Sequence, residues 1–284
     1  ATIVSRKVLD YPSPYNLSFE FVGMPNHTKI SSASGIYAMP ETALDLLEPS
    51  ILRWLFIRCD PRERLFFDLE NRLFEMYNEW DSLTDKVARG KASESTIHIY
   101  RHSTIFSDKI RNSKTLIPFK HICYTMLSTL GDRDLTLQIL ASQRRIDLSL
   151  DTLRKQLEIR LACAYNWATK YSPVEDRVLV RNSFNFEAYE TMDLETRDCV
   201  RILFRKLDDN WSYEALKNLV NNIPKMVKKL SVKQKPTQEV RELQRKFFKA
   251  LYKLICNRDN GPRIDILLLA VGKEHTRRLL LPSE

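Results

Sequence analysis

Apolar residues recur three and four positions apart along much of this chain. In residues 70–88 they form one stripe, made of Leu73, Met76, Tyr77, Trp80, Leu83 and Val87. In residues 237–257 a second stripe runs through a segment rich in Arg and Lys, and consists of Val240, Leu243, Phe247, Leu251 and Leu254. This spacing is typical of amphipathic helices that bury one face. Glycine supports the same conclusion, since it accounts for only 6 of 284 residues and costs about 1 kcal/mol in a helix interior. The chain is therefore predicted to be mainly α.

Start and stop signals divide this helical pattern into segments. Pro40 and Glu41 favour the start of a helix, because proline suits the first turn and an acid suits the positive end of the helix dipole. Glu48-Pro49 is expected to divide the stretch 40–58 into two short helices. The later helices are expected at about 115–131, 132–143, 149–171, 193–208, 212–230 with an interruption at Pro224, 237–257 and 264–281.

Three stretches lack this pattern. Residues 17–24 alternate apolar and polar side chains, as a β-strand does. Residues 89–114 are polar and are expected to form a linker or a hairpin-like excursion, because residues 97–102 alternate in a β-like manner. Residues 172–192 are irregular. His98 and His102 are four apart, but in a β-like context without a nearby carboxylate we expect no metal site.

The charge of the chain is concentrated near its C-terminus. Residues 211–284 hold 16 Lys or Arg and 7 Asp or Glu, a net charge of +9 that equals the net charge of the whole chain. Such a basic region either attracts a polyanion such as nucleic acid or is a solvated, lysine-rich helical surface. No run of 18 apolar residues occurs, so no membrane span is expected. The five cysteines form no CxxC pair and are predicted to be reduced and buried in a cytoplasmic protein.

Residues 26–35, NHTKISSASG, combine one lysine with several small hydroxylated residues. A flexible ammonium group on a loop of small residues can hold phosphate groups, whose close approach to the backbone small side chains allow. An ordinary surface turn has a similar composition. The loop alone therefore leaves both interpretations open.

The surroundings of this loop resemble the final catalytic segment of class I aminoacyl-tRNA synthetases, and in particular the class I lysyl-tRNA synthetases. The blocks that carry the resemblance are KISSASG (29–35), LEPSILRWLFIR (47–58), RLFFDLENRLFEMYNEWDSL (64–83) and GPRIDILLLAVGKE (261–274). The last block is also similar to the terminal helices of the glutamyl enzymes. The resemblance implies that residues 1–39 are the short β/loop end of a Rossmann-like catalytic domain. It further implies a helical stem-contact region at 40–114 and, at 115–284, a helical bundle or superhelical cage that binds the anticodon.

The resemblance also implies roles for the loop residues. Lys29 would stabilise the pyrophosphate side of ATP, accompanied by Mg²⁺, while lysine is adenylated. The ATP loop would consist of Lys29, Ile30, Ser31, Ser32 and Ala33. Ser32 and Ser34 stand where the family pattern carries lysines. We therefore expect this loop to stabilise the negative charge on ATP less strongly. No HIGH-type motif precedes the loop, so the chain is expected to be the C-terminal half of the enzyme and inactive alone.

Contacts with tRNA are expected in the basic last quarter. Unstacked bases are read by aromatic side chains and phosphates by cations, so the candidates are Trp211, Tyr213, Arg258, Arg263, Lys273, Arg277 and Arg278. The partners implied are tRNA-Lys, with L-lysine and ATP in the intact enzyme, acting in a cytoplasmic monomer. Three alternatives remain at this point. They are a synthetase of glutamyl-like specificity, a tRNA-binding module without catalysis, and a helical protein–protein adaptor, which would lack salt-dependent RNA affinity.

Overall fold

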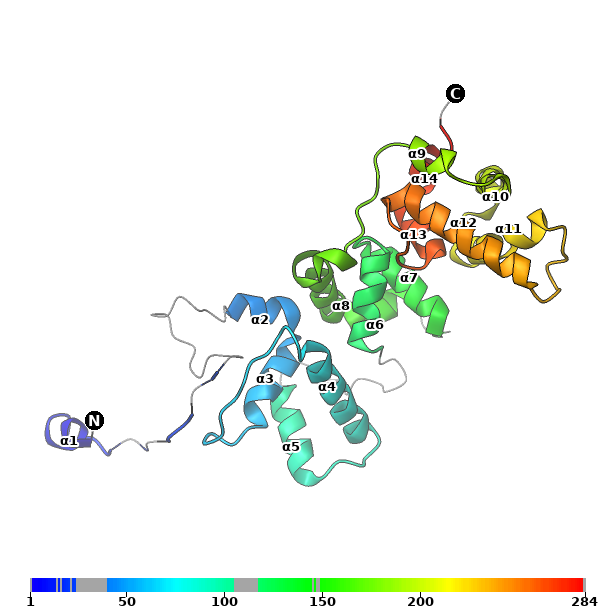
Figure 1. Ribbon diagram of the computed structural model, residues 1–284. Coiled ribbons are helices and arrows are strands. Elements are labelled where there is room, and N and C mark those ends of the chain that lie inside the picture. The colour runs from blue at the N-terminus through cyan, green and yellow to red at the C-terminus, as the bar shows by residue number, and fades with distance from the viewer. Residues whose placement is uncertain are drawn as a thin grey trace. The chain divides into compact units, whose positions relative to one another are not determined.

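The computed structural model describes residues 2–13, 15, 17–20, 22–23, 40–104, 117–144, 146 and 149–282. Helices dominate these residues, which confirms the prediction of a mainly α fold, and no named strand occurs among them. The chain divides into two compact units, Ala1–Leu116 and Ile117–Glu284, each of which contains its own helices (Figure 1). Within the described ranges, none of the helices combines the length and apolar character that crossing a bilayer would require.

The first unit is built around a small aromatic core. Its helices are α1 (Thr2–Lys7), α2 (Pro40–Leu46), α3 (Pro49–Ile57), α4 (Leu73–Ala88) and α5 (Glu94–Ser103). The ring of Trp80 lies between Trp54, 5.9 Å away, and Tyr100, 5.5 Å away, and all three side chains are buried. The predicted break at Glu48-Pro49 is confirmed, because Glu48 is extended and Pro49 begins α3. The Tyr77 hydroxyl donates to the Leu46 carbonyl at 3.0 Å and so ties the end of α2 to α4.

Helix α5 corrects one prediction. Residues 94–103 form a helix, so this part of 89–114 is neither a linker nor a hairpin. The Ser93 hydroxyl accepts a hydrogen bond from the Thr96 N–H at 3.3 Å and caps the first turn. Ile97 and Tyr100 are three positions apart, and Tyr100 is buried against Trp80. Residues 97–102 alternate as a strand would, but packing of one face of α5 against Trp80 favours the helix.

The strand predicted at 17–24 is reduced to one parallel bridge among its described residues, between Gly23 and Phe66. The Gly23 N–H donates to the Leu65 carbonyl at 2.9 Å, and the Phe67 N–H donates to the Gly23 carbonyl at 2.8 Å. Leu17 and Phe19 are 62% and 77% exposed, respectively. Among the described residues of this segment, the pattern therefore forms no strand beyond the bridge, and its apolar side chains Leu17 and Phe19 are not buried.

In the second unit, the helices after residue 185 pack around the apolar stripe of 237–257, and three earlier helices pack on one another. Figure 1 shows its helices α6 (Phe119–Ser128), α7 (Arg133–Arg144), α8 (Leu150–Asn166), α9 (Phe186–Glu190), α10 (Leu194–Lys206), α11 (Tyr213–Val227), α12 (Gln238–Cys256), α13 (Ile264–Val271) and α14 (Lys273–Leu280). All five apolar residues of the predicted α12 stripe are buried, as expected. Two boundaries differ from the prediction. Pro224 lies inside α11 without ending it, and Gly272, with φ +86°, separates α13 from α14.

The core of the second unit also contains a charged side chain. Arg160, on α8, is fully buried, and its guanidinium donates to the Ile117 carbonyl at 3.1 Å. Leu153, Leu157 and Leu161 occupy the same buried face of α8. The long side chain of Arg160 therefore fills core space while its polar end satisfies a backbone group just before α6.

Candidate nucleic-acid interface

The predicted ATP loop, residues 29–33, lies outside the described residues, and its role stays a prediction. The structure describes the chain on both sides of it. On one side Gly23 pairs with Phe66, and on the other α2 begins at Pro40. The segment that leads toward the loop is thus attached to residues 61–67, which directly precede the turn before α4.

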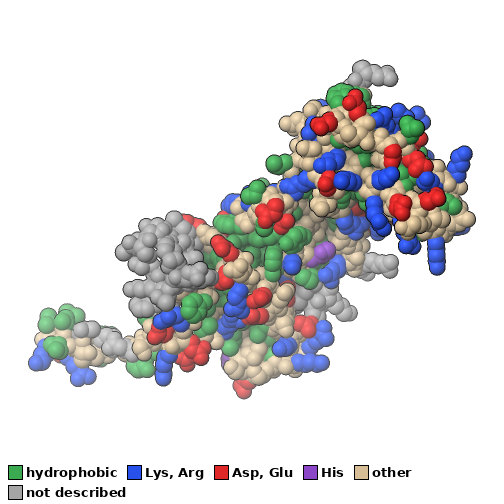
Figure 2. Space-filling view, in the orientation of Figure 1, with side chains coloured by type: hydrophobic (Ala, Val, Ile, Leu, Met, Phe, Trp, Pro, Cys, Tyr) green, Lys and Arg blue, Asp and Glu red, His purple; other side chains and the backbone are tan. Residues whose placement is uncertain are grey.

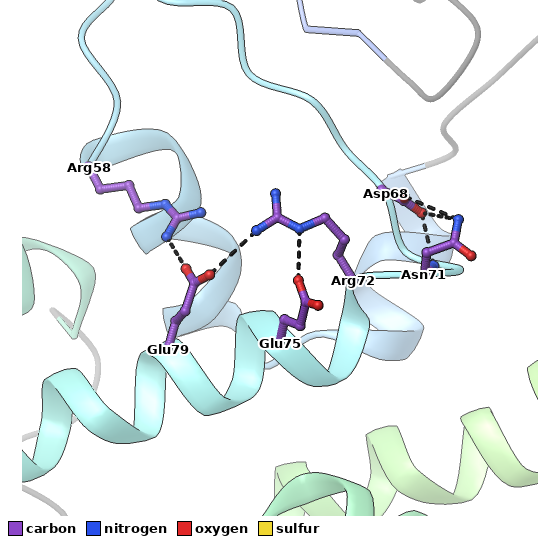
Figure 3. A network of polar contacts seen from close by, with 6 residues as sticks. All are labelled: Arg58, Asp68, Asn71, Arg72, Glu75 and Glu79. Carbon is purple, nitrogen blue, oxygen red and sulfur yellow. Dashed lines mark hydrogen bonds and ion pairs between the residues drawn. The ribbon is translucent and has the colours of Figure 1, made fainter.

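A network of ion pairs joins two of the sequence blocks that carry the family resemblance. Arg58 follows α3, pairs with Glu79 of α4 and lies 3.9 Å from the centre of the Trp54 ring. Arg72 contacts Glu79 at 3.4 Å and Glu75 at 3.0 Å, and Figure 3 shows Glu79 between the two guanidinium groups. These side chains are substantially exposed, so each pair contributes little to stability. Their effect is to hold the end of α3 beside the first turns of α4.

The turn before α4 is closed by Asp68. Its carboxylate accepts a hydrogen bond from the Asn71 N–H at 2.9 Å and two more from the Asn71 side chain at 3.2 Å (Figure 3). The Asp68 carbonyl accepts from the Arg72 N–H at 3.2 Å. An aspartate that bonds to the backbone a few residues further on is a common way to fix a turn. This turn directs the chain from its bridge with Gly23 into α4.

In the second unit, five of the seven predicted tRNA-binding residues lie around the start of α11. The guanidinium of Arg263 lies 5.7 Å from the centre of the Tyr213 ring. Lys273 and Arg277, from α14, pair with Asp208 at 3.3 and 2.9 Å, in the 3₁₀ turn Asp208–Asn210 that precedes α11. We call this group the α11 junction, and it comprises Asp208, Trp211, Tyr213, Arg263, Lys273 and Arg277. Sequence positions up to 69 apart are thus brought together.

The polar groups of the α11 junction already have partners within the unit. Arg263 contacts Asp265 at 2.6 Å, and Lys273 and Arg277 share Asp208. Tyr213 is partly buried and accepts a hydrogen bond from the Gln143 amide at 3.3 Å. Trp211 is partly buried and packs against the apolar core. A nucleic acid at this junction would therefore have to displace existing contacts.

The other two candidates lie apart from the junction. The Arg258 guanidinium donates to the carbonyls of Glu175 and Arg177 at 2.6 and 2.7 Å, so it fixes part of the irregular stretch 172–192. Arg278 is exposed on α14. Arg258 therefore has a structural role, whereas the exposed Arg278 is available to a partner.

A set of cations outside the predicted candidates is more accessible. We call them the turn cations, because they lie in the turn after α11 and on the first half of α12: Lys229, Lys233, Lys235, Arg241 and Arg245. All are exposed, and none forms an ion pair within the described part of the chain. Figure 2 shows Lys and Arg side chains projecting from this end of the unit, with acidic ones among them. The lysine-rich composition of residues 225–235 was the sequence signal that could have indicated them.

Other cations of α12 are neutralised by acids. Lys246 contacts Asp193 at 2.7 Å, and Lys253 contacts Asp259 at 2.9 Å. The hydrogen bond from Lys246, followed by one from Thr196, lowers the pKa of Asp193 to about 2. A hydrogen bond from Lys253 likewise lowers the pKa of Asp259. These shifts mark carboxylates that stay ionised at neutral pH and remain bound to the lysines.

The histidine pair differs from its sequence interpretation. His98 and His102 lie on the helix α5, and His98 is 3.9 Å from the carboxylate of Glu94. The two predicted features, a β-like segment and the lack of a nearby carboxylate, were therefore wrong. In the parts of the chain that the structure describes, no three His, Cys, Asp or Glu side chains gather as a metal site would require.

The chain is similar to known aminoacyl-tRNA synthetases. A model of the family described as "tRNA synthetases class I (K)" matches residues 1–105. The lysine–tRNA ligase of Streptomyces coelicolor is 31% identical over 274 residues, which cover 94% of this chain and 46% of that protein. Those of Treponema pallidum and Thermococcus kodakarensis are 22% and 24% identical, over 99% and 95% of this chain and 51% and 50% of theirs. The chain thus spans about half the length of these curated relatives.

The first unit thus carries a match to the class I aminoacyl-tRNA synthetases, and nearly the whole chain is similar to lysine–tRNA ligases. Both findings are consistent with a fragment of a class I lysyl-tRNA synthetase.

Proposed function

We propose that this chain is the C-terminal portion of a class I lysine–tRNA ligase. The intact protein would activate lysine with ATP and transfer it to tRNA-Lys, in the cytoplasm and as a monomer. The observation that carries this proposal is the similarity to the Streptomyces coelicolor lysine–tRNA ligase across 94% of the chain. The three relatives named above are all lysine–tRNA ligases, which favours lysine over a glutamyl-like specificity.

In this proposal the first unit contributes to adenylation. Lys29 would place its ammonium beside the triphosphate of ATP, where negative charge develops as pyrophosphate leaves. Ser31 and Ser32 add hydroxyl groups, so the donor set of the loop suits phosphate oxygens. ATP would bring Mg²⁺ with it, because divalent ions neutralise the triphosphate. The bridge at Gly23 and the start of α2 would anchor the two ends of this loop.

The second unit would bind the anticodon arm. Its excess of positive charge supports this role, because cations that contact phosphates supply much of the affinity for nucleic acid. The α11 junction holds aromatic and cationic side chains together, which suits unstacked bases once its internal contacts open.

Binding of the chain to a tRNA-Lys transcript tests this function. A second transcript with a changed anticodon is titrated in parallel, and both titrations are repeated over a series of salt concentrations. We expect binding that weakens with salt and that falls by about 1–3 kcal/mol for each altered base, the scale of stacking one base on an aromatic ring. Equal binding to both transcripts would reduce the second unit to a general polyanion surface. No binding to either would refute the proposal for this chain.

A tRNA-binding module without catalysis is the second candidate. It is favoured by one observation, the presence of Ser32 and Ser34 where the family pattern carries lysines. Restoring one cation distinguishes the two candidates in a protein that contains the remaining catalytic residues. In a ligase, Ser32→Lys should raise lysine-dependent ATP–pyrophosphate exchange, whereas in a module without catalysis the exchange should stay absent in both forms.

A further inference from the structure

The turn between α11 and α12 is held in a defined conformation. The Lys225 ammonium donates to the carbonyls of Val232 and Gln234 at 2.7 and 2.8 Å. The Leu230 N–H donates to the Lys225 carbonyl at 2.8 Å, with Lys229 in the left-handed region at φ +56°. This pattern closes α11 as a Schellman motif does. The turn is thus tied to the helix before it and presents its side chains from a fixed backbone.

The turn cations differ in charge balance from the basic clusters at the α11 junction and along the rest of α12. Three of them, Lys229, Lys233 and Lys235, extend from the turn, and Arg241 and Arg245 are one helical turn apart on α12. All five are exposed, and the acids of the same segment are Glu239 and Glu242. Glu242 accepts a hydrogen bond from Gln238 at 3.0 Å. Five cations against two acids leave a positive surface even though the acids lie on the same helix.

In those other clusters a phosphate would have to compete with a carboxylate. Lys246 is bound to Asp193, and Lys249 and Lys253 are bound to Asp259. Lys273 and Arg277 are bound to Asp208. Binding a phosphate at any of these cations gives up an existing ion pair, whereas the turn cations exchange only water and mobile counterions. Release of counterions favours binding, so the first contact with a polyanion should be made by the turn cations.

We propose that the α11–α12 turn is the surface that binds the phosphate backbone of the RNA, and that the α11 junction contributes less to affinity. This inference rests on the proposed function, in which the second unit binds tRNA. Lysine and arginine contacts to phosphates fix the position of a protein on nucleic acid without reading the base sequence. The turn would therefore supply affinity and salt dependence but no discrimination between anticodons.

Two variants of the full chain with matched charge test this surface. The turn variant carries Lys233→Gln, Arg241→Gln and Arg245→Gln. The control variant carries Lys246→Gln, Lys249→Gln and Lys253→Gln, which remove the same charge from the ion-paired side of α12. Binding of each to the tRNA-Lys transcript is measured over a salt series from about 50 to about 200 mM, and circular dichroism melting verifies that each variant folds.

We expect the turn variant to bind at least about tenfold more weakly than the parent at about 100 mM salt. Its slope of log K against log salt concentration should fall by about 2–3, near one for each phosphate group that the variant no longer neutralises. The control variant should stay within about threefold of the parent and keep its slope. Both transcripts should be affected equally by the turn variant. If that variant melts early, Lys233→Gln alone, which lies outside every described helix, should still lower the slope by about one.

Four other outcomes of these binding experiments would contradict the proposal or the function on which it rests. A parent chain that binds tRNA while the turn variant binds equally well overturns this inference and leaves the proposed function standing. A control variant that weakens as much as the turn variant also overturns it, because total charge would then decide the affinity. A turn variant that no longer binds anionic lipid vesicles but still binds RNA would assign the surface to a membrane instead. A parent chain that binds no tRNA overturns both the inference and the proposed function.

Discussion

Arg160 is the largest fully buried side chain among the described residues. It is fully buried, and it donates to the Ile117 carbonyl at 3.1 Å. Removing one partner of a buried hydrogen bond costs the desolvation of the group left behind, about 1–3 kcal/mol, and truncating a large side chain adds a cavity. Buried polar groups are therefore not interchangeable with exposed ones of the same type.

We predict that Arg160→Ala lowers the free energy of unfolding by about 2–4 kcal/mol, from the unsatisfied carbonyl and the cavity together. Urea denaturation followed by circular dichroism measures the decrease. Arg154→Ala is the matched control on the same helix, because Arg154 is exposed and pairs with Asp134 at 2.8 Å. Its effect should stay below about 1 kcal/mol. Similar decreases in both variants would contradict a special role for the buried guanidinium.

The sequence could have indicated this position but not its partner. Leu153, Leu157, Leu161 and Ala164 place residue 160 on the apolar face of α8 by helical spacing alone. An arginine there looks like an exception to the pattern until the carbonyl of Ile117, 43 residues away, is seen to accept its hydrogen bond. A contact between residues 43 positions apart cannot be predicted from the spacing of apolar residues within one helix.

At the scale of the element, α10 begins with a cap that also forms an ion pair. Asp193 accepts a hydrogen bond from the Thr196 N–H at 2.8 Å and contacts Lys246 of α12 at 2.7 Å. These bonds, led by the one from Lys246, lower the pKa of Asp193 to about 2. A carboxylate with a lowered pKa stabilises the fold above the ordinary aspartate pKa of about 4, and this stabilisation disappears as the pH falls through about 2.

We predict that Asp193→Ala destabilises the second unit by about 0.5–2 kcal/mol at pH 7, since alanine cannot cap the helix. Asp193→Asn keeps the cap and removes only the charge, because asparagine caps a helix as well as aspartate does. The difference in melting temperature between the parent and Asp193→Asn should therefore vanish between about pH 4 and pH 2. Melting curves from about pH 7 to about pH 2 measure it. A difference that persists unchanged at the acid end would show that the ion pair is not its cause.

Sequence reasoning predicted elements well where a stripe was long. The apolar stripes of α4 and α12 span several turns, and their central residues are buried as expected. It failed for α5, because ten residues with Ile97 and Ile99 two apart satisfy a strand period as easily as a helix period. Three of the predicted tRNA-binding cations, Arg263, Lys273 and Arg277, lie at the α11 junction, and their role in binding tRNA stays a prediction. Their neutralisation by Asp208 and Asp265 was missed, because side-chain pairing is a tertiary property.

At the scale of the whole molecule, the two compact units have separate cores. Leu251 is fully buried in the larger one, and Leu73 is 2% exposed in the smaller one. We predict that Leu251→Ala lowers the free energy of unfolding of residues 117–284 by about 2–5 kcal/mol, the usual cost of such a cavity. Leu73→Ala should destabilise the other unit instead. Calorimetry of both variants measures this. A single transition lowered equally by both would show that the units unfold together.

The reactivity of the cysteines can report how often individual helices of the second unit open. Cys59 is partly accessible, whereas Cys123, Cys163, Cys199 and Cys256 are buried, one each on α6, α8, α10 and α12. Burial raises the pKa of Cys123 and raises the pKa of Cys199 to about 12, so few reactive thiolates form at neutral pH. An alkylating reagent can modify these four only when the helix that carries them opens. The alkylation rate of each buried cysteine therefore measures how often its helix opens. No cysteine has to be introduced by mutation for this measurement.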